Sequence, residues 1–598
     1  MCGFLAEFDL AKGFSEECSP KISPDAESQI LRRGPDFLHR IKDSKFNISF
    51  AHLAITDVSH GVQPFYTSNG FLAFGNGEIY NSLEILSRLN LPEYVLSDIG
   101  THDIKIGAEL LSKDPEANWE QLDGMFSILL YGPDGEIFLG RDRVGEKPAF
   151  YFISDKRLIF GSSVEAVAMQ VGMPLALDQK QLNNWLAFGG CDVGTTLFSE
   201  IREVRPGSVI KFSKKAFSEF RYWHWPVRGT EYNIPENYQS EILKIVESYR
   251  VKDFDGCLFW SGGVDSSAIR HSLSLSGFTP DSIHVSFDEK TYNEDLPEIN
   301  RNLGKSREMI ILFEDWLNEL AIKEAINLMD QPISDAACLP LLAACIEAKE
   351  NSFRVVYTGD GADEILRGYQ AIRYERYLIL LIRLLRLVPK LALRGSFDIL
   401  SRKSDRKYLS KLSVFLRLIA AALVDKSYSR QILVSPNFFI ATTFPEVLDS
   451  NEVNGPTDLE EYFQSFILPQ IYLQKTDRMA SGIGLEARSP WLSKLSIETS
   501  MRFGEKFLSK VGKPLSMILS EDDRLRKKSK HGLGVPLKLV LTILQRPIWT
   551  IPELSSKKLD QIWSRALRGS PAAQNAAWSL YVLNEKIQSW RAIGIMKQ

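Results

Sequence analysis

The sequence predicts two folded parts of different class: an α+β part built on sheets up to about Trp225, then an α/β part with a parallel sheet that ends in a largely helical region. Two observations carry this prediction. Short apolar runs broken by Gly, Asn, Asp and Pro dominate the first part, whereas apolar strands alternate with helical stretches in the second. The length of 598 residues allows several domains.

The first part is expected to consist of strands joined by tight turns. Strand-like runs lie at 46–56, 70–80, 126–142 and 149–163, and Pro133-Asp134-Gly135 marks a hairpin. Helices are expected at about 82–89 and 103–112.

The second part follows a polar stretch at 228–235. Apolar strands are predicted at 256–260, 282–287, 308–313 and 353–359, with helical stretches between them. This alternation is typical of βαβ units and a parallel sheet. From about Gln370 onward, the chain is expected to be mostly helical.

The most membrane-like stretch runs from 377 to 393, but three basic residues and Pro389 interrupt it. A spanning helix needs about 20 predominantly apolar residues. We therefore expect no membrane span here but a buried or interface helix, with a membrane-surface helix as the minor alternative.

Composition excludes several classes of protein. The formal net charge is -4, so no overall positive field indicates a nucleic-acid partner. The six cysteines include no CxxC pair, which argues against a disulfide scaffold or a structural zinc site. The N-terminus lacks the pattern of a secretory signal, and a cytoplasmic location is expected.

A glycine- and serine-rich loop directly after the predicted strand 256–260 is the strongest local motif. Glycine allows backbone N–H groups to approach an anion at the start of a helix, and the hydroxyls add donors. The absence of the lysine of a GxxxxGK[ST] loop favours a grip on pyrophosphate, and hence an adenylate intermediate. The weaker alternative is a plain turn that caps a helix. The candidate nucleotide-binding residues here are Ser261, Gly262, Gly263, Asp265 and Ser266.

A second acidic turn, Thr358 to Glu364, follows the predicted strand 353–359. Its carboxylates would repel one another unless a cation or a basic partner lay beside them. Both loops are expected to meet at the carboxyl edge of the parallel sheet. Taken alone, a solvated acidic turn would be equally plausible.

Cys2 is a candidate nucleophile, because removal of Met1 would give it a free α-amine that can act as base for its own thiol. Asn76 and Gly77 could form an oxyanion hole, and Glu78 and Asp103 could bind an ammonium group. A cysteine at position 2 alone is a weak signal.

Together these motifs resemble the asparagine synthetase family, in which a class II glutamine amidotransferase domain is fused to an ATP-pyrophosphatase synthetase domain. The resemblance covers almost the whole chain and divides it into an amidotransferase domain at 1–212, a linker at 213–235 and a synthetase domain at 236–598. It implies an N-terminal nucleophile sandwich for the first domain. The motifs that carry it include RGPD (33–36), NGEIYN (76–81), SGGVDSS (261–267), TGDGADEILRGY (358–369), TDRMASGIGLEARSPWL (476–492), GK (512–513) and KSKHGLGVP (528–536).

The resemblance implies a reaction in two sites. Cys2 attacks the side-chain amide of glutamine, and the released ammonia travels inside the protein to a carboxylate, such as aspartate, that ATP has activated as an acyl-adenylate. The amide, AMP and pyrophosphate are the products, and Mg²⁺ and ATP are required. The roles implied are glutamine binding by His52, Asn76, Gly77, Glu78 and Asp103, ATP binding by the SGGVDSS loop with Val285, Thr358 and Gly359, magnesium ligation by Asp265 and Asp363, and catalysis by Asp360 and Lys530. A homodimer is also consistent with the family.

Three departures from the family pattern bear on the substrates. His52 stands where the family carries the arginine that clamps the glutamine carboxylate, and an imidazole does not replace a bidentate guanidinium. Either glutamine use is weak or altered, or His52 suffices with help from Glu78 and Asp103. Asp360 replaces a frequent glutamate, while Ser493 and the 528–533 segment also differ.

Four functions therefore have to be weighed. The leading one is a glutamine-using asparagine synthetase or a close relative, and the alternative amidates a non-aspartate acid in a specialised pathway with weak or absent glutaminase activity. Members of the family that join an internal amine tend to lack the N-terminal cysteine, so the presence of Cys2 argues against that class. The intact loops make a non-catalytic binding protein the least favoured reading.

Overall fold

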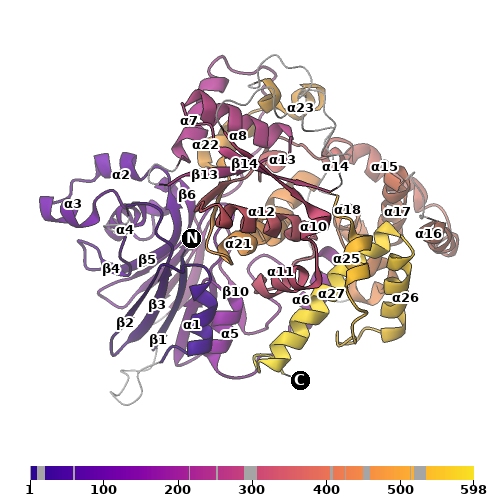
Figure 1. Cartoon of the computed structure of the whole chain (residues 1–598), viewed down its shortest axis with the longest axis horizontal. Coiled ribbons are helices and arrows are strands. Elements are labelled where there is room, and N and C mark those ends of the chain that lie inside the picture. The colour runs from indigo at the N-terminus through magenta and orange to yellow at the C-terminus, as the bar shows by residue number, and fades with distance from the viewer. Residues whose placement is uncertain are drawn as a thin grey trace.

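The computed structural model describes residues 2–9, 21–57, 61–213, 216–250, 254–287, 306–403, 409–424, 426–448, 458–511, 513–517 and 534–597. Figure 1 shows the N-terminal sheets at one end of the molecule and the C-terminal helices at the other, with the parallel sheet between them.

Two six-stranded sheets form the N-terminal part. The first has the order β10-β8-β9-β1-β3-β2 and the second β12-β11-β7-β6-β5-β4, with antiparallel pairing between neighbours. The strands of the first sheet are β1 Gly3–Asp9, β2 Phe37–Lys42, β3 Phe46–His52, β8 Phe150–Ile153, β9 Arg157–Gly161 and β10 Ile201–Glu203. Those of the second are β4 Phe65–Tyr66, β5 Leu72–Ile79, β6 Gly124–Tyr131, β7 Ile137–Arg141, β11 Ser208–Ser213 and β12 Ala216–Arg221.

The two sheets pack face to face and carry helices on their outer faces. Alternating side chains from both sheets, among them Phe4 and Phe74, fill the space between them. Helices α1 Pro24–Leu31 and α5 Val164–Val171 cover the first sheet, and α4 Asp103–Lys113 covers the second, beside α2 Ser82–Arg88 and α3 Glu93–Ile99. The result is a four-layered sandwich, helix–sheet–sheet–helix.

The synthetase part is built on a five-stranded sheet in which all pairs are parallel, with the order β15-β14-β13-β16-β17. Strand order reverses around the central β13, the point at which such sheets bind ligands beyond their carboxyl ends. The strands are β13 Gly256–Phe259, β14 Asp281–Ser286, β15 Glu308–Leu312, β16 Val355–Tyr357 and β17 Glu486–Arg488. The helices that accompany them are α7 Tyr238–Ser248, α8 Val264–Leu275, α10 Phe313–Trp316, α11 Glu319–Leu328, α12 Cys338–Glu350 and α13 Ala362–Ile365.

The remainder of the described chain is mostly helical. It comprises α14 Gln370–Arg373, α15 Glu375–Leu385, α16 Lys390–Lys403, α17 Leu409–Leu423, α18 Ser429–Val434, α19 Phe438–Thr443, α20 Leu459–Tyr462, a π-helix at Phe463–Tyr472, α21 Leu473–Ser481, α22 Lys494–Met501, α23 Glu505–Val511, α25 Leu537–Ile543, α26 Ser556–Leu567 and α27 Pro571–Ala592. Among the described residues, no helix combines the length and apolar character needed to cross a membrane.

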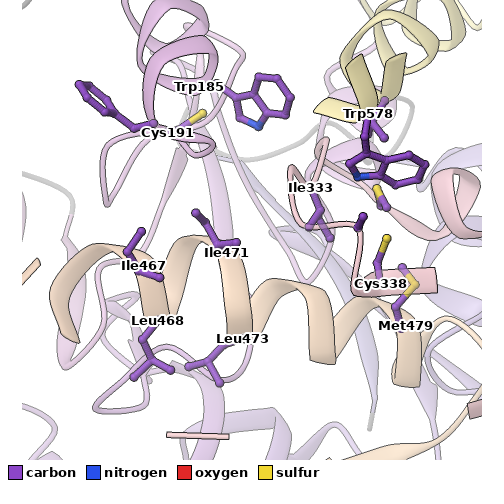
Figure 2. Close-up of a cluster of buried hydrophobic side chains, with 14 of the residues drawn as sticks. Trp185, Cys191, Ile333, Cys338, Ile467, Leu468, Ile471, Leu473, Met479 and Trp578 are labelled. Carbon is purple, nitrogen blue, oxygen red and sulfur yellow. The ribbon is translucent and has the colours of Figure 1, made fainter. Parts of the chain in front are cut away.

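One continuous apolar core joins the two parts of the chain. Trp185 lies on α6 Gln179–Phe188 of the N-terminal part, a helix that begins at the Asp178 cap and ends at Gly189 with φ +87°. Its indole Nε1 donates to the carbonyl of Pro332 in the synthetase part at 2.9 Å. Figure 2 shows Trp185 in one buried cluster with residues of the π-helix and α21 and with Trp578 of α27. Burial of this kind holds the two parts in a fixed relation.

The fold class is confirmed, and the structure refines several elements. The expected helices appear as α2 and α4. Strand β12 lies inside 213–235, the predicted linker, and pairs with β11 along its whole length, so the second sheet continues to Arg221. The division of the chain into domains stays a prediction. The expected helix at 377–393 is two helices, α15 and α16, separated around Pro389.

Candidate active site: a thiol pocket and a phosphate loop

Cys2 lies directly before β1, 7% exposed, and its backbone N–H donates to Oδ1 of Asn76 on β5 at 2.8 Å. Burial raises the pKa of the Cys2 thiol to about 11, while the nearby amino terminus opposes this rise. A thiol in this state needs a base before it can act as a nucleophile.

The amide of Asn76 is half satisfied. Its oxygen accepts from Cys2, but its Nδ2 is buried and makes no hydrogen bond within the described residues. Gly77, next along β5, has φ +132°, and a Cβ there would lie 1.9 Å from the carbonyl oxygen of Met125. Only glycine fits this position. A buried amide N–H without an acceptor, beside a thiol, is the donor that an oxyanion requires.

A small pocket opens beside Cys2, with His52 and Asp103 among its walls. His52 ends β3 and is 5% exposed; burial lowers the pKa of its imidazole to about 4. It is therefore a neutral side chain at pH 7. The walls are formed by Cys2, His52, Leu53, Ile55, Thr56, Gln63, Gly77, Glu78, His102, Asp103, Ile104 and Glu486.

Asp103 is the first residue of α4, where its Oδ2 accepts from the backbone N–H of Ile79 at 2.7 Å. Burial raises the pKa of Asp103, and the charge of Glu78 raises it further. Two carboxylates in one buried pocket favour a cationic ligand between them.

Glu78 already has a basic partner from the other part of the chain. Its Oε2 lies 3.1 Å from Nη2 of Arg488 on β17, and Thr56 donates its hydroxyl to both carboxylate oxygens. The Nε of Arg488 donates to Glu486 at 2.8 Å. Glu486 is itself a wall of the Cys2 pocket, so the synthetase part contributes a carboxylate to the thiol site.

The phosphate loop joins β13 to α8, whose first turn it precedes. Gly263 caps α8, and the Ser266 hydroxyl lies 3.3 Å from that of Ser261. Trp260 donates its indole N–H to the Ser267 hydroxyl at 3.1 Å. These hydrogen bonds fix the loop at the start of a 12-residue helix, an arrangement that is suited to binding an anion.

Lys513 bridges the two predicted magnesium ligands. Its Nζ lies 2.6 Å from a carboxylate oxygen of Asp265 and 2.5 Å from one of Asp363. The acidic turn and the phosphate loop meet here, since a Cβ on Gly359 would lie 3.2 Å from the Cβ of Asp265. Two carboxylates that converge on one cation are a donor set that fits Mg²⁺, with phosphate oxygens and water as further ligands.

Asp360 lies on the same acidic turn, is half-buried and accepts hydrogen bonds from hydroxyls. Thr476 donates to its Oδ2 at 2.8 Å and Thr358 at 3.0 Å. The Thr358 hydroxyl also lies 2.8 Å from that of Ser489, the residue after β17.

Two further acids in this part of the chain are paired: the half-buried Asp335 and the buried Glu364. Lys475 donates to Asp335 at 2.7 Å, and Tyr369 donates its hydroxyl to Glu364 at 2.7 Å. Burial raises the pKa of Glu364 to about 7.

Strand β17 connects the thiol pocket to the synthetase site within three residues. Glu486 lines the thiol pocket and Arg488 pairs with the pocket residue Glu78, while the carbonyl of Arg488 accepts from the backbone N–H of Thr358 at 2.9 Å. A second link is the bidentate pair of Arg33 with Asp477, at 2.8 and 3.0 Å, in which Arg33 also donates to the Cys2 carbonyl at 3.4 Å.

The structure brings most predicted site residues into two clusters. Cys2, His52, Asn76, Gly77, Glu78 and Asp103 meet at the thiol pocket, and Ser261, Gly262, Gly263, Asp265, Ser266, Thr358, Gly359, Asp360 and Asp363 lie on the two loops at the edge of the parallel sheet. Val285 is half-buried on β14, beside β13. Lys530 lies outside the described residues.

Sequence reasoning missed Glu486, Arg488 and Lys513 as site residues. All three belong to motifs already noted, at 476–492 and 512–513. The available signal was a basic residue within each motif. Apart from the pair Glu486–Arg488, the acidic partners of Arg488 and Lys513 lie more than 140 positions away in sequence.

Comparisons with known proteins agree with this geometry. The glutamine amidotransferase domain matches residues 1–223, and asparagine synthase matches residues 238–516. Asparagine synthetase [glutamine-hydrolyzing] 1 of Bacillus subtilis is 25% identical, over 90% of this chain and 87% of its own length. Asparagine synthetase [glutamine-hydrolyzing] 3 of the same organism is 26% identical, over 94% and 93%. Amidase chry2 of Gibberella zeae is 24% identical over 63% of this chain and 60% of its own.

The fold and the two sites therefore define a glutamine amidotransferase domain joined to a synthetase domain. The chain belongs to the asparagine synthetase family, as a glutamine-hydrolysing carbon–nitrogen ligase.

Proposed function

We propose that this ligase converts a carboxylic acid, with aspartate as the first candidate, to its amide with ammonia from glutamine, and releases AMP and pyrophosphate. The observation that carries the proposal is strand β17, which contacts the Cys2 pocket and the Asp360 site within three residues. A cytoplasmic location and a homodimer remain predictions.

In the thiol pocket, Cys2 is the proposed nucleophile. Once Met1 is removed, the α-amine of Cys2 takes the thiol proton, and the sulfur attacks the amide carbon of glutamine. The oxyanion is stabilised by the Nδ2 of Asn76, which has no acceptor among the described residues, together with Gly77. Ammonia leaves, and water then hydrolyses the thioester to glutamate.

Substrate binding in this pocket differs from a guanidinium clamp. The neutral His52 offers one hydrogen bond to the glutamine carboxylate. Asp103 is the proposed partner of the glutamine ammonium, because Glu78 and Glu486 are both already paired with Arg488.

In the synthetase site, an oxygen of the acid attacks the α-phosphorus of ATP and pyrophosphate leaves. The phosphate loop binds the leaving group through Ser261, Ser266 and the free amides of α8. Asp265 and Asp363 would hold magnesium, which would neutralise negative charge on the phosphates. Lys513, which lies between the two carboxylates in this structure, would then be available to bind the pyrophosphate.

Ammonia completes the reaction by attacking the acyl carbon, which expels AMP. Asp360, positioned by Thr358 and Thr476, is the proposed acceptor of the proton that the nitrogen loses. Lys530 is proposed to stabilise charge during both steps.

The test uses ammonium, which bypasses the question of His52. Purified protein is mixed with ATP, Mg²⁺, aspartate and ammonium, and AMP and asparagine are followed by mass spectrometry. Equal amounts of both support the proposal. AMP without asparagine, or neither product while ATP binds, contradicts aspartate as the acid.

A different acid is the second candidate function, favoured by Asp360 in place of glutamate and by the departures in the 528–533 segment. Ser493 does not add to it. Its hydroxyl accepts from the backbone N–H of Ser496 at 3.1 Å and caps α22, a role that serine and aspartate share. A screen of carboxylates for ammonium-dependent AMP formation distinguishes the two candidates.

A further inference from the structure

Helix α15 is apolar on two opposite faces. Ile382 is 2% exposed, and Leu378, Ile379 and Leu385 pack with it against the core. The opposite face is also apolar but points outward. An amphipathic helix of a globular protein carries polar residues there, so the outward face of α15 departs from the usual pattern.

The outward residues form one stripe that continues into the first turn of α16. Within α15, spacings of 3, 4 and 7 positions place Tyr377, Leu380, Leu381 and Leu384 along one side of the helix, and the remaining residues flank it in sequence. Most are more than half exposed, and along the sequence no other described segment of this length holds as many exposed large apolar side chains. We call these residues the α15 stripe: Tyr374 (56% exposed), Tyr377 (67%), Leu380 (54%), Leu381 (44%), Leu384 (52%), Leu387 (81%), Val388 (39%) and Leu391 (84%).

Basic side chains border the α15 stripe. Between Tyr374 and Arg394 the sequence holds five basic residues and one acid. The acid, Glu375, turns inward and pairs with Arg430 at 2.7 Å. Arg376, Arg383, Lys390 and Arg394 are exposed. The surface that covers this stripe must therefore be apolar at its centre and negatively charged at its edge.

A second copy of the chain does not meet this requirement. In a twofold interface the same patch faces itself, so the two basic borders would be brought together. Repulsion between these two basic borders opposes association of the two copies.

An anionic bilayer surface meets the requirement for an apolar centre and a negatively charged edge. Leucines enter the acyl region, tyrosines lie at the level of the headgroups, and long basic side chains reach the phosphates. The stripe lies at the edge of the molecule farthest from the N-terminal sheets, where α15 and α16 project (Figure 1). An outward-projecting helix suits a broad surface, whereas a bound peptide helix needs a groove.

We propose that the α15 stripe docks this enzyme on the surface of an anionic lipid bilayer. The docking is peripheral.

The test is co-sedimentation of the full chain with vesicles of phosphatidylcholine alone or of phosphatidylcholine and phosphatidylglycerol in a 3:1 ratio. Binding to the anionic vesicles is expected to exceed binding to the neutral ones and to weaken with salt. The double variant Leu380→Glu/Leu384→Glu is expected to bind at least about tenfold more weakly.

The matched control is Leu83→Glu/Leu320→Glu, which adds the same charges at exposed leucines, 54% and 79%, away from the stripe. It should bind the vesicles like the natural chain, and both double variants should keep ammonium-dependent AMP formation. Absence of binding to anionic vesicles, or equal binding by both variants, overturns the proposal. Two other results would also overturn the proposal. One is a concentration-dependent dimer that only the stripe variant fails to form. The other is binding of a soluble acidic helical peptide, without vesicle binding, that only the stripe variant loses.

Discussion

The thiol pocket and the phosphate-loop site each pair a carboxylate with a basic residue, but they differ in how firmly that basic residue is held. In each, a carboxylate predicted to bind a substrate or metal is paired with a basic residue from a distant segment: Glu78 with Arg488, and Asp265 with Lys513. The Arg488 side chain is 2% exposed, has a second acidic partner in Glu486 and donates to the carbonyl of Tyr249. The Lys513 side chain is 11% exposed, and its ion pairs with Asp265 and Asp363 both go through the terminal ammonium group.

The charge of Arg488 is therefore part of the folded structure, whereas the charge of Lys513 can change partners. A buried arginine fixed by several partners cannot leave without exposing unpaired charges, so Arg488 holds the two domains together. An ammonium group at the edge of a phosphate loop can be displaced by magnesium and then bind phosphate. The following predictions test this contrast, beginning with the thiol on which the first site depends.

Cys2→Ala should abolish glutamine-dependent turnover, by at least about 10³-fold, because no other group in the pocket replaces the nucleophile. Ammonium-dependent turnover should remain, since the synthetase site is unchanged. Both rates are measured as AMP formation. Equal loss of both would contradict the separation into two sites.

Arg488→Met should lower the free energy of unfolding by about 3–5 kcal/mol, because Glu78 and Glu486 would be left buried without their partner. Urea unfolding measures the change. The control is Arg40→Met, which breaks the exposed Arg40–Glu27 pair and should cost no more than about 1 kcal/mol. Similar shifts in both variants would mean that the buried pair has no special role.

His52→Gln should reduce the acid sensitivity of the fold. The pKa of His52 is about 4 in the folded protein, below its ordinary 6.5, so the unfolded chain binds the proton first. The stability contribution of neutral His52 is thus present above pH 6.5 and is lost as the pH falls toward 4, by about 3 kcal/mol. Urea midpoints measured across this range should fall less in the variant. Parallel curves would show that His52 does not titrate in this way.

Lys513→Met should lower ammonium-dependent AMP formation by about 10²-fold, because a cation that stabilises the leaving pyrophosphate is lost. Mg²⁺ should raise the melting temperature more than in the natural chain, since Asp265 and Asp363 would lack their ammonium partner. Lys510→Met, an exposed lysine on α23, is the control. An unchanged magnesium response would place the metal elsewhere.

Local features of the chain were predictable from sequence. The strand–turn signals around Pro133–Gly135 and the loops at 261–267 and 358–364 depend on neighbouring residues, and the structure has strands and loops there. Helices α2 and α4 also follow from local pattern. The segment β12 falls in the linker that the family resemblance placed at 213–235, although it forms a local pair with the adjacent strand β11.

Long-range pairing was not predictable in the same way. Nothing near Glu78 indicates that an arginine 410 positions later would reach it, because that contact depends on how β17 joins the parallel sheet. The stretch 377–393 shows the same limit. Its apolar content predicts burial, but the fold buries only one face of α15 and leaves the other exposed.

The most direct test of the central claim follows the amide nitrogen from one site to the other. The full chain is incubated with glutamine labelled with ¹⁵N at the amide, ATP, Mg²⁺ and aspartate, and glutamate, AMP and the product amide are measured by mass spectrometry. The account predicts AMP and ¹⁵N-labelled asparagine in equal amounts, and neither from the Cys2→Ala variant. Glutamate that forms without AMP and without a labelled amide would contradict it.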